Sequence, residues 1–406
     1  MSSADPQGLQ AFPDELASRE AWLEPFEWYR TMRDDAPVRY DPSRRTWDVF
    51  RYDDVKRVLD DDETFSVDLR QATTYEPPER PEEELIFETM LFQDPPRHGQ
   101  LRGVVEDAFR PSELADLEPR IREIAVELLE EARAEGEELD VVADFAYPLP
   151  VIVIAELLGV PATDRGRFKR WSDTLVASTS AEAPDDEIFT EYQQSQYEMA
   201  TYFLEALEER REAPRDDLLT TIATDEDEDG NRLSQEEALG TCILLLVAGN
   251  ITTTNLITNA IRCFLGAEID DPRAEATLST AIEEVLRHRS PVQAMTRVVA
   301  RDVTLAGEDL EEGDQVIAWM GSANRDERQF PDAETFVPDR SPNQHLGFGH
   351  GTHYCLGAPL ARLEARVALE EFYDRLDGVD RVDAGLEPTR SSFIYGVESL
   401  PIRHDG

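Results

Sequence analysis

Apolar residues recur at intervals of three and four positions along most of the chain, which is the spacing of one face of an α-helix. Segments 113–135, 146–158, 187–211 and 277–289 follow this spacing, and a longer helix with an apolar stretch is expected from about 235 to 266. Alternating apolar and polar positions, which are typical of strands, are confined to short stretches. The pattern predicts a mainly α-helical fold with small β-sheets.

Three short stretches predict the sheets. Residues 38–40 and 47–52 are rich in aromatic and β-branched side chains and flank a turn, which predicts a hairpin. Residues 297–320 alternate and contain turn signals, and residues 391–403 give a third short β-segment. We find no internal repeat and no long flexible linker, so the sequence predicts a single domain over residues 1–406.

The charge of the chain narrows the classes of partner. Lys and Arg number 40 against 87 Asp and Glu, which gives a formal net charge of −47. Nucleic acids and anionic membranes carry phosphate that such a surface repels, so neither is expected as a partner. Acidic chains can be disordered, but 8% aromatic residues and recurring helical patterns favour a folded protein.

The type of cation is also unusual, because Lys56 and Lys169 are the only lysines and every other cation is arginine. A folded chain of this length exposes roughly 16,000 Å², or about 180 Å² for each carboxylate. Neighbouring carboxylates on such a surface repel one another. The screening length falls from about 8 Å at physiological salt to about 3 Å in molar salt, so high salt weakens this repulsion. The composition resembles that of proteins from salt-loving archaea; an acidic mesophilic protein is the alternative.

Cysteine usage and the start of the chain bear on location. Cys242, Cys263 and Cys355 are odd in number and widely spaced, which fits a reducing cell interior and offers no disulfide framework. The first ten residues lack the basic residue and apolar run of a signal peptide. The longest apolar span, 242–249, is shorter than the roughly 20 residues of a membrane helix. We expect a soluble, cytoplasmic protein that does not bind membranes.

The segment FGHGTHYCLG at 348–357 carries the strongest chemical signal. Three glycines surround Cys355, and glycine lets a backbone turn tightly and lie against a flat ligand without a Cβ clash. A helix is predicted from Pro359 onward, which places the sulfur near a helix N-terminus. Backbone N–H groups and the positive end of the helix dipole stabilise a thiolate there, and such a thiolate is a good iron ligand.

This segment resembles the haem-binding loop of the cytochrome P450 family, whose pattern is F-G-x-G-x-H-x-C-x-G. The resemblance covers residues from about 20 to 403 and implies a cytochrome P450 fold with haem b as the cofactor. Cys355 then takes the place of the axial thiolate ligand of the iron, with Phe348, His353 and Gly357 around the cofactor.

Two other interpretations of the same segment stay open. One is a glycine-rich loop with a buried free cysteine. The other is a zinc site formed by His350, His353 and Cys355, although this spacing lacks an obvious fourth ligand and leaves the glycines unexplained.

A second motif lies at the end of the predicted helix 277–289. Glu284 and Arg287 are three positions apart on one helical face, close enough for an ion pair, and Pro291 ends the helix. By spacing alone a solvated surface pair is the common interpretation. The resemblance identifies the family's E-x-x-R motif, with Arg340 as the arginine that completes a buried structural triad.

Four basic side chains are candidates for binding the haem propionates. His98 and Arg102 are four positions apart and therefore neighbours on one helical face. The two carboxylates of haem need charge-assisted donors when they are partly buried. The resemblance assigns this role to His98, Arg102, Arg297 and His353, and surface cations are the alternative.

The helix from about 235 to 266 is expected to line the face of the haem that binds oxygen. Its apolar stretch is followed by three threonines, whose hydroxyls can bond back to carbonyls four positions earlier and distort the helix. Ala248 and Gly249 leave space beside that distortion for a flat ring. The resemblance implies that Thr252 is the catalytic alcohol, hydrogen-bonded to iron-bound oxygen.

The family pattern around this threonine is A-G-x-acid-T, and this chain departs from it. Ile251 stands where the family has an acid, so the usual carboxylate that relays protons is missing. We expect protons to arrive through ordered water held by Thr252, Asn250 or Asn255, or from a polar group on the substrate.

The resemblance implies a monooxygenase that inserts one oxygen atom of O₂ into an apolar organic substrate. Electrons would come from a separate ferredoxin and its reductase. Ile251 leaves open a peroxide-driven or rearranging haem-thiolate enzyme, and a non-enzymatic haem protein that binds a ligand is the third possibility. For the ferredoxin we expect a local basic island, formed by Arg97, Arg110, His350, Arg362 and Arg366.

Overall fold

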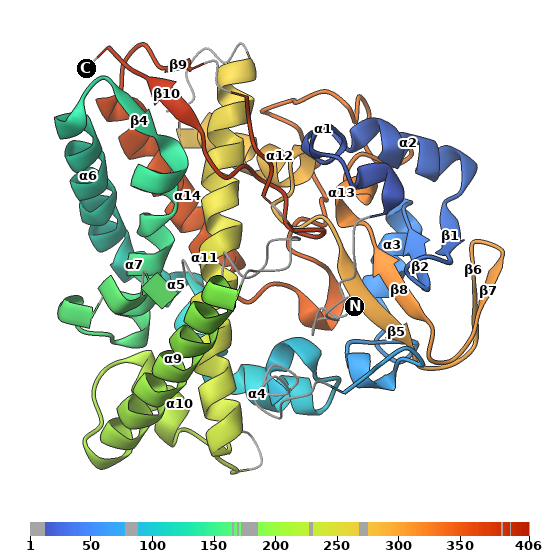
Figure 1. Ribbon diagram of the computed structural model, residues 1–406, viewed down its shortest axis with the longest axis horizontal. Helices are drawn as coiled ribbons and strands as arrows, with labels where there is room; N and C mark the ends of the chain where they lie inside the picture. The colour runs from blue at the N-terminus through green and yellow to red at the C-terminus, as the bar shows by residue number, and fades with distance from the viewer. Residues whose placement is uncertain are drawn as a thin grey trace. The chain divides into compact units, whose positions relative to one another are not determined.

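The structure is a computed structural model that describes residues 13–77, 88–164, 166–168, 170–171, 186–226, 230–267, 275–382, 385–389 and 391–405. Its contacts divide into two compact units, whose elements are labelled in Figure 1. Unit 1 comprises Met1–Glu79, Asn255–Cys355 and Leu376–Asp405, and unit 2 comprises mainly Arg80–Thr254 and Leu356–Arg375. Because each unit takes segments from distant parts of the sequence, no single cut in the chain separates them.

Unit 1 contains a five-stranded sheet in the order β1-β2-β8-β5-β3. β1 and β2 form the predicted hairpin, in which Val38 lies opposite Val49, and β2 pairs with β8 in parallel. Two further antiparallel pairs are β6 with β7 and β9 with β10. The strands are β1 (Val38–Asp41), β2 (Thr46–Val49), β3 (Phe65–Ser66), β5 (Met295–Val299), β6 (Val303–Leu305), β7 (Glu308–Leu310), β8 (Gln315–Ala318), β9 (Asp380–Arg381) and β10 (Pro401–Arg403).

Helices cover this sheet with apolar side chains. Tyr52, Val55, Val58 and Leu59 lie on one face of α3 and are buried in a cluster that includes β-strand residues such as Val316. The spacing of these four residues is that of an amphipathic helix. The helices of unit 1 are α1 (Arg19–Leu23), α2 (Phe26–Asp35), α3 (Tyr52–Asp60), α12 (Glu275–His288) and α13 (Met320–Ala323).

Unit 2 is mainly helical. α6 and α14 lie side by side in it (Figure 1). Arg122 of α6 joins them, because its guanidinium donates to Glu370, at 2.7 Å, and to Glu371. The elements of this unit are α4 (Arg97–Val105), α5 (Pro111–Leu114), α6 (Glu118–Glu135), β4 (Glu138–Asp140), α7 (Pro148–Leu158), α9 (Asp186–Glu212), α10 (Leu218–Thr224) and α14 (Ala358–Arg375).

The long helix α11 (Gln235–Gly266) has the bounds that the sequence predicts. Its start is fixed by a capping box, in which the Ser234 hydroxyl accepts the N–H of Glu237 at 3.1 Å. The Glu237 carboxylate in turn accepts the N–H of Ser234 at 2.8 Å. These two bonds satisfy donors that a helix start otherwise leaves open.

Two helical stretches are long and apolar enough, by length and composition, to cross a membrane. They are Val141–Leu158, which includes α7, and Gln235–Gly266, which is α11. In each stretch more than half of the most apolar window is buried, at 56% and 61%. Core helices of soluble proteins pass the same test, so we interpret both stretches as core helices.

The tail differs from the predicted β-segment at 391–403. Only Pro401–Arg403 forms a strand there, and Ile394 makes a single bridge with Val292. The reason is a local turn, because the Ser391 hydroxyl accepts the N–H of Ile394 at 3.2 Å. A side chain that bonds its own backbone competes with strand pairing.

Candidate functional site

The cysteine loop, residues 346–355, is closed by its own backbone. The N–H of Cys355 donates to the carbonyl of Phe348 at 2.9 Å, and the N–H of Gly349 donates to Leu346 at 2.9 Å. Gly349 and Gly351 have φ of +75° and +70°, in the left-handed region that side chains rarely adopt. The prediction that these glycines let the chain turn tightly before the cysteine is confirmed.

Gly351 is also required by packing. A Cβ placed on it would lie 2.9 Å from the Asp60 Oδ1 and 3.0 Å from the Leu59 carbonyl oxygen. The loop therefore lies directly against the end of α3. One short turn of 3-10 helix, Gly351–His353, connects this contact to Cys355.

The surroundings of the three thiols differ. Burial raises the pKa of the Cys242 thiol, and it raises the pKa of Cys263 to about 11, so both stay protonated at neutral pH. Cys355 is exposed, and a Cβ on Gly357 would meet nothing within 4 Å. The interpretation as a buried free cysteine is therefore wrong, and Cys355 is the thiol that a ligand can reach.

A zinc site has no ligand set in the structure. Among the residues that the structure describes, no group of three or more His, Cys, Asp or Glu side chains could hold a metal ion together. His350 instead lies with its Nε2 3.7 Å from the carboxylate of Asp60.

The Glu284 triad is buried. Arg287 donates to both carboxylate oxygens of Glu284, at 2.8 and 2.7 Å, and neither residue has any exposed area. The Nε of Arg340 lies 3.0 and 3.1 Å from the same two oxygens. The solvated surface pair that spacing alone favours is therefore wrong, because three charged groups satisfy one another inside the protein.

A chain of hydrogen bonds connects this triad to the cysteine loop. The Arg287 guanidinium donates to the carbonyl of Asn324 at 2.8 Å. The Asn324 side-chain oxygen accepts the N–H of Leu346 at 2.7 Å, where the loop begins. The triad thus holds the base of the loop in place, and Asn324 is a part of this support that the sequence motifs did not reveal.

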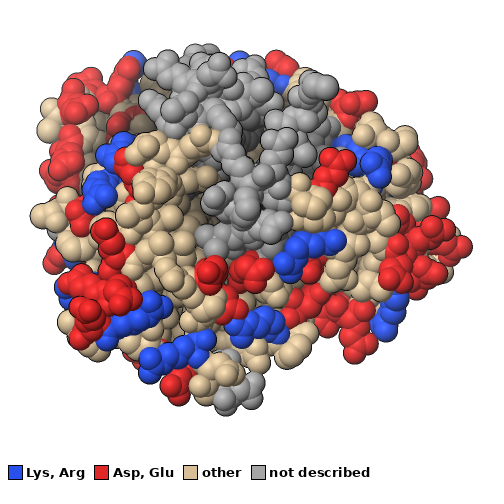
Figure 2. Space-filling model, turned by 60° about the horizontal axis from the view of Figure 1, so that its bottom comes forward, with Lys and Arg blue, Asp and Glu red and all other residues tan. Residues whose placement is uncertain are grey.

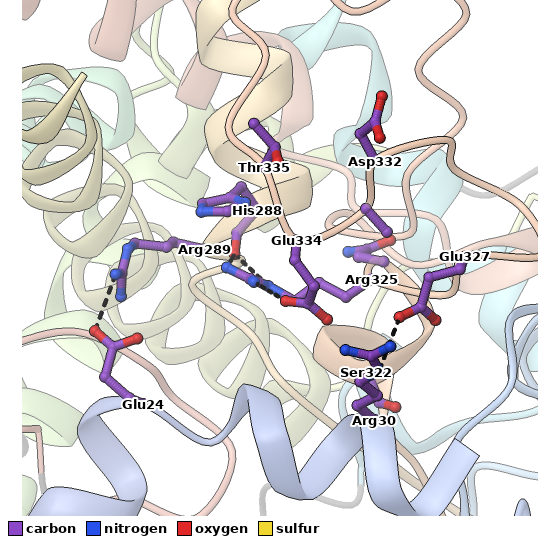
Figure 3. Close-up of polar contacts among 12 residues, drawn as sticks. Glu24, Arg30, His288, Arg289, Ser322, Arg325, Glu327, Asp332, Glu334 and Thr335 are labelled. Atoms are coloured by element: carbon purple, nitrogen blue, oxygen red, sulfur yellow. Dashed lines mark hydrogen bonds and ion pairs between the residues drawn. The ribbon is translucent and has the colours of Figure 1, made fainter. Parts of the chain in front are cut away.

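His288 directly follows Arg287 of the triad in the sequence, and Figure 3 shows it with Arg289 and Arg325. Arg325 donates to the His288 carbonyl at 2.7 Å and to Glu334 at 2.5 Å. The imidazole is 9% exposed and stacks on Phe26, and no described group hydrogen-bonds to its Nδ1. Burial, and then the charges of four arginines led by Arg325, lower the pKa of His288 far below its ordinary value.

This histidine makes the fold sensitive to acid. Below about pH 6.5 the His288 imidazole is protonated in the unfolded chain, whereas it stays neutral in the folded chain. Stability therefore falls as the pH falls, by up to about 1.4 kcal/mol per pH unit. We expect His288→Phe, which keeps the ring between Phe26 and Phe336, to lose less stability from about pH 7.5 to about pH 5.5. Urea unfolding of both proteins across this range measures the difference, and parallel curves would contradict the assignment.

The middle of α11 has an open face. Ala248 is exposed and Val247, Gly249, Ile251 and Thr252 are half-buried, within a helix that is mostly buried. A Cβ on Gly249 would meet nothing within 4 Å. Small residues and open space along one stripe of an apolar helix suit a flat apolar group such as haem.

Two of the three threonines bond back along α11, as predicted, and the helix continues through them to Gly266. The Thr252 hydroxyl donates to the Ala248 carbonyl at 2.8 Å, and the Thr254 hydroxyl donates to the Asn250 carbonyl at 3.0 Å. The Thr252 hydroxyl proton is already donated to the Ala248 carbonyl. Its oxygen therefore remains available only as a hydrogen-bond acceptor.

Sequence reasoning missed Glu364, a buried carboxyl group of α14. Its side chain is 2% exposed and hydrogen-bonds with Thr253. Burial raises the pKa of Glu364 to about 8, so the group holds a proton at neutral pH. One signal lies in the sequence, because Glu364 is four positions from each of Leu360 and Ala368, on an apolar face of the helix.

The four predicted propionate donors lie in two pairs. In unit 2, His98 is buried and Arg102 half-buried on α4, where the Arg102 Nε lies 3.7 Å from Glu106. In unit 1, Arg297 is buried on β5 and donates to its neighbour's carbonyl, and His353 is half-buried in the cysteine loop. Two imidazoles and two guanidiniums are the donors that a pair of carboxylates takes.

The expected basic island is largely neutralised. Arg97 pairs with Glu237, Arg110 with Asp107, and Arg366 with Glu118 and Glu370. These cations and their carboxylates all belong to unit 2.

Comparison with known proteins gives one answer. The family model "Cytochrome P450" matches residues 23–275 and 267–377. Cytochrome P450 109 from Bacillus spizizenii is 42% identical over 96% of this chain and 94% of its own length. Substrate-free CYP109E1 from Bacillus megaterium, a solved structure, is 43% identical, has a TM-score of 0.88, and is matched over 94% of this chain and 99% of its own. The solved complex of CYP109E1 with testosterone is also 43% identical, with a TM-score of 0.85, and the match covers 96% of this chain and 100% of that one.

Proposed function

Because this chain belongs to the cytochrome P450 family, we propose that Cys355 is the axial ligand of its iron. The protein is a haem-thiolate monooxygenase with haem b as its cofactor. When bound, the haem supplies the activation of O₂ and the oxidising power, and the protein supplies ligand, anchors and a dry pocket. The exposed thiol on a loop bent by two left-handed glycines is the observation that carries the assignment of Cys355.

The absorption spectrum of the reduced, CO-bound protein tests this assignment. We expect the red-shifted band of thiolate-ligated haem, and we expect Cys355→His to lose it. Cys242→Ser and Cys263→Ser serve as controls, because both thiols are buried and protonated. A red-shifted band that survives in Cys355→His would contradict the proposal.

We assign the remaining site residues by the same family pattern. Phe348 and Gly357 lie around the cysteine, and Ala248 and Gly249 offer the open stripe of α11 to the ring. His98, Arg102, Arg297 and His353 would bind the propionates, and the match between donors and carboxylates supports this role.

For the proton supply we propose Glu364 in addition to water held near Thr252. Ile251 cannot carry a proton, and Asn250 is buried in the helix. Glu364 holds a proton at neutral pH and hydrogen-bonds with Thr253, the neighbour of Thr252. A protonated carboxyl group in this position takes over the task of the missing acid.

The amount of product formed per electron pair consumed, the coupling, tests the roles of Thr252 and Glu364. We expect Thr252→Ala and Glu364→Gln each to lower the product formed per electron pair by about a hundredfold, the low end of a general acid–base effect. Ile251→Glu restores the family's acid and raises coupling. If Ile251→Glu and Thr252→Ala both leave coupling unchanged, the assignment of Thr252 is wrong.

We propose an apolar, medium-sized substrate. Val247 and Ile251 border the open stripe of α11, and Met90 and Leu91 lie shortly before α4. The apolar residues 85–87, which the sequence also suggests for the pocket, fall outside the described residues. CYP109E1 has been solved with testosterone and with corticosterone. A steroid is therefore the first compound to titrate, with the shift of the haem spectrum as the readout.

We propose a separate ferredoxin and reductase as the source of electrons, and a cytoplasmic location. The missing acid at Ile251 favours one alternative, in which peroxide supplies the oxygen atom. Product formed with peroxide but not with reduced ferredoxin and O₂ would decide for that alternative.

A further inference from the structure

The last turn of α3 and the residues after it form a run of four carboxylates, Asp60, Asp61, Asp62 and Glu63, that lies against the cysteine loop. We propose that Asp62, acting through Thr352, is a positioning residue for the haem-thiolate loop. The inference rests on the proposed role of Cys355. It concerns a contact that joins the cysteine motif to the residues after α3 and involves no member of the Glu284 triad.

The contact is specific. The Thr352 hydroxyl donates to the Asp62 carboxylate at 2.8 Å, and both side chains are half-buried. Thr352 is the middle residue of the turn Gly351–His353, just before Cys355. A hydrogen bond to a charged acceptor is among the stronger ones, so it fixes the turn.

The neighbouring residues of the run have other tasks. The Asp61 side chain accepts the N–H of Thr64 at 3.2 Å, in the turn that follows α3. Glu63 is 79% exposed at its side chain and lies 3.5 Å from Arg301. Asp60 packs against Gly351 with its side-chain Oδ1 and its Cα, and among the described residues its carboxylate forms only the long 3.7 Å pair with His350. Asp62 is thus the member of the run that holds a loop side chain by a short hydrogen bond.

Asp62 acts in two ways that can be separated. Its oxygen holds Thr352 in place, and its charge adds a negative potential beside the loop. A nearby negative charge disfavours the addition of an electron, so it lowers the reduction potential of a group bound there. An amide at this position keeps the acceptor oxygen and removes the charge.

The test uses the haem-loaded protein and four variants. Asp62→Ala and Thr352→Val remove the hydrogen bond, and Asp62→Asn and Thr352→Ser keep it. For the first two we expect a smaller fraction of the thiolate band in the CO complex and about tenfold faster transfer of haem to an acceptor protein, the effect of one charge-assisted hydrogen bond. Thr352→Ser keeps the wild-type spectrum and rate.

The reduction potential gives a readout that a purely structural role would not move. Asp62→Asn keeps the thiolate band but has a more positive potential than the wild type. Glu63→Ala, which removes an exposed carboxylate from the adjacent position, leaves haem transfer unchanged and is the matched control.

The outcomes separate this inference from the proposed function. A wild-type protein without the thiolate band would overturn the role of Cys355. A wild-type protein with the band, whose Asp62→Ala and Thr352→Val variants keep the same band and haem-transfer rate, would overturn the role of Asp62 alone.

Discussion

Replacing Glu284 by Gln is expected to lower the free energy of unfolding by about 3–5 kcal/mol, because it leaves two buried guanidinium groups without their counter-charge. Arg287 has no exposed area and the Arg340 side chain is 7% exposed, so water cannot replace the lost carboxylate. The Glu284 oxygens also accept the N–H of Val337 and the amide of Asn343. Urea unfolding of the wild type and the variant measures the loss.

An exposed ion pair provides the control. Asp34 and Arg328 lie 3.0 Å apart, with side chains 54% and 48% exposed. Asp34→Asn removes one carboxylate charge just as Glu284→Gln does, but we expect it to cost less than about 1 kcal/mol. Equal losses in the two variants would show that the burial of the triad does not set its contribution.

The second large effect is expected from salt. We propose that the acidity is an adaptation to high salt, and we expect the melting temperature to rise by roughly 10 °C or more between dilute buffer and molar KCl. Acidic groups form larger patches than basic groups on the face in Figure 2, and basic groups lie beside acidic ones. The run from Asp60 to Glu63 concentrates four such charges at one helix end. Salt screens their repulsion, which otherwise favours unfolding.

A neutral osmolyte separates screening from general stabilisation. Sucrose stabilises folded proteins because it is excluded from their surface, and it does not screen charge. We expect KCl to raise the melting temperature far more than sucrose at the same osmolality. A melting temperature that stays flat up to molar KCl, or that rises equally in sucrose, would contradict salt adaptation.

Local signals explain how much of the fold the sequence predicts. α11 has the predicted bounds, Gln235–Gly266, because its long apolar stretch lies in the sequence itself, and a capping box fixes its start. The hairpin around Asp41 is found because strand and turn residues lie next to each other. The cysteine loop is found because its glycines occupy backbone conformations that few other residues tolerate.

Groups brought together from distant positions could not be predicted in this way. Asp62 and Thr352 are 290 positions apart, and neither stands out in its own segment. Glu364 has only its place on an apolar helix face as a sequence signal, and its raised pKa arises from the burial that tertiary packing imposes. The same holds for His288, whose pKa is lowered by burial and then by four arginines gathered from three segments.

The arginines of the triad hold the chain by its backbone. Arg287 donates to the carbonyls of Asn324, Ala333 and Thr335, and Arg340 donates to those of Pro331 and Asp332. Hydrogen bonds from a guanidinium to main-chain oxygens depend on the position of the backbone and not on the type of side chain at each residue. Exposed positions such as Thr335 are therefore free to drift during evolution, and they are suitable sites for an engineer who wishes to redesign the surface without disturbing the core.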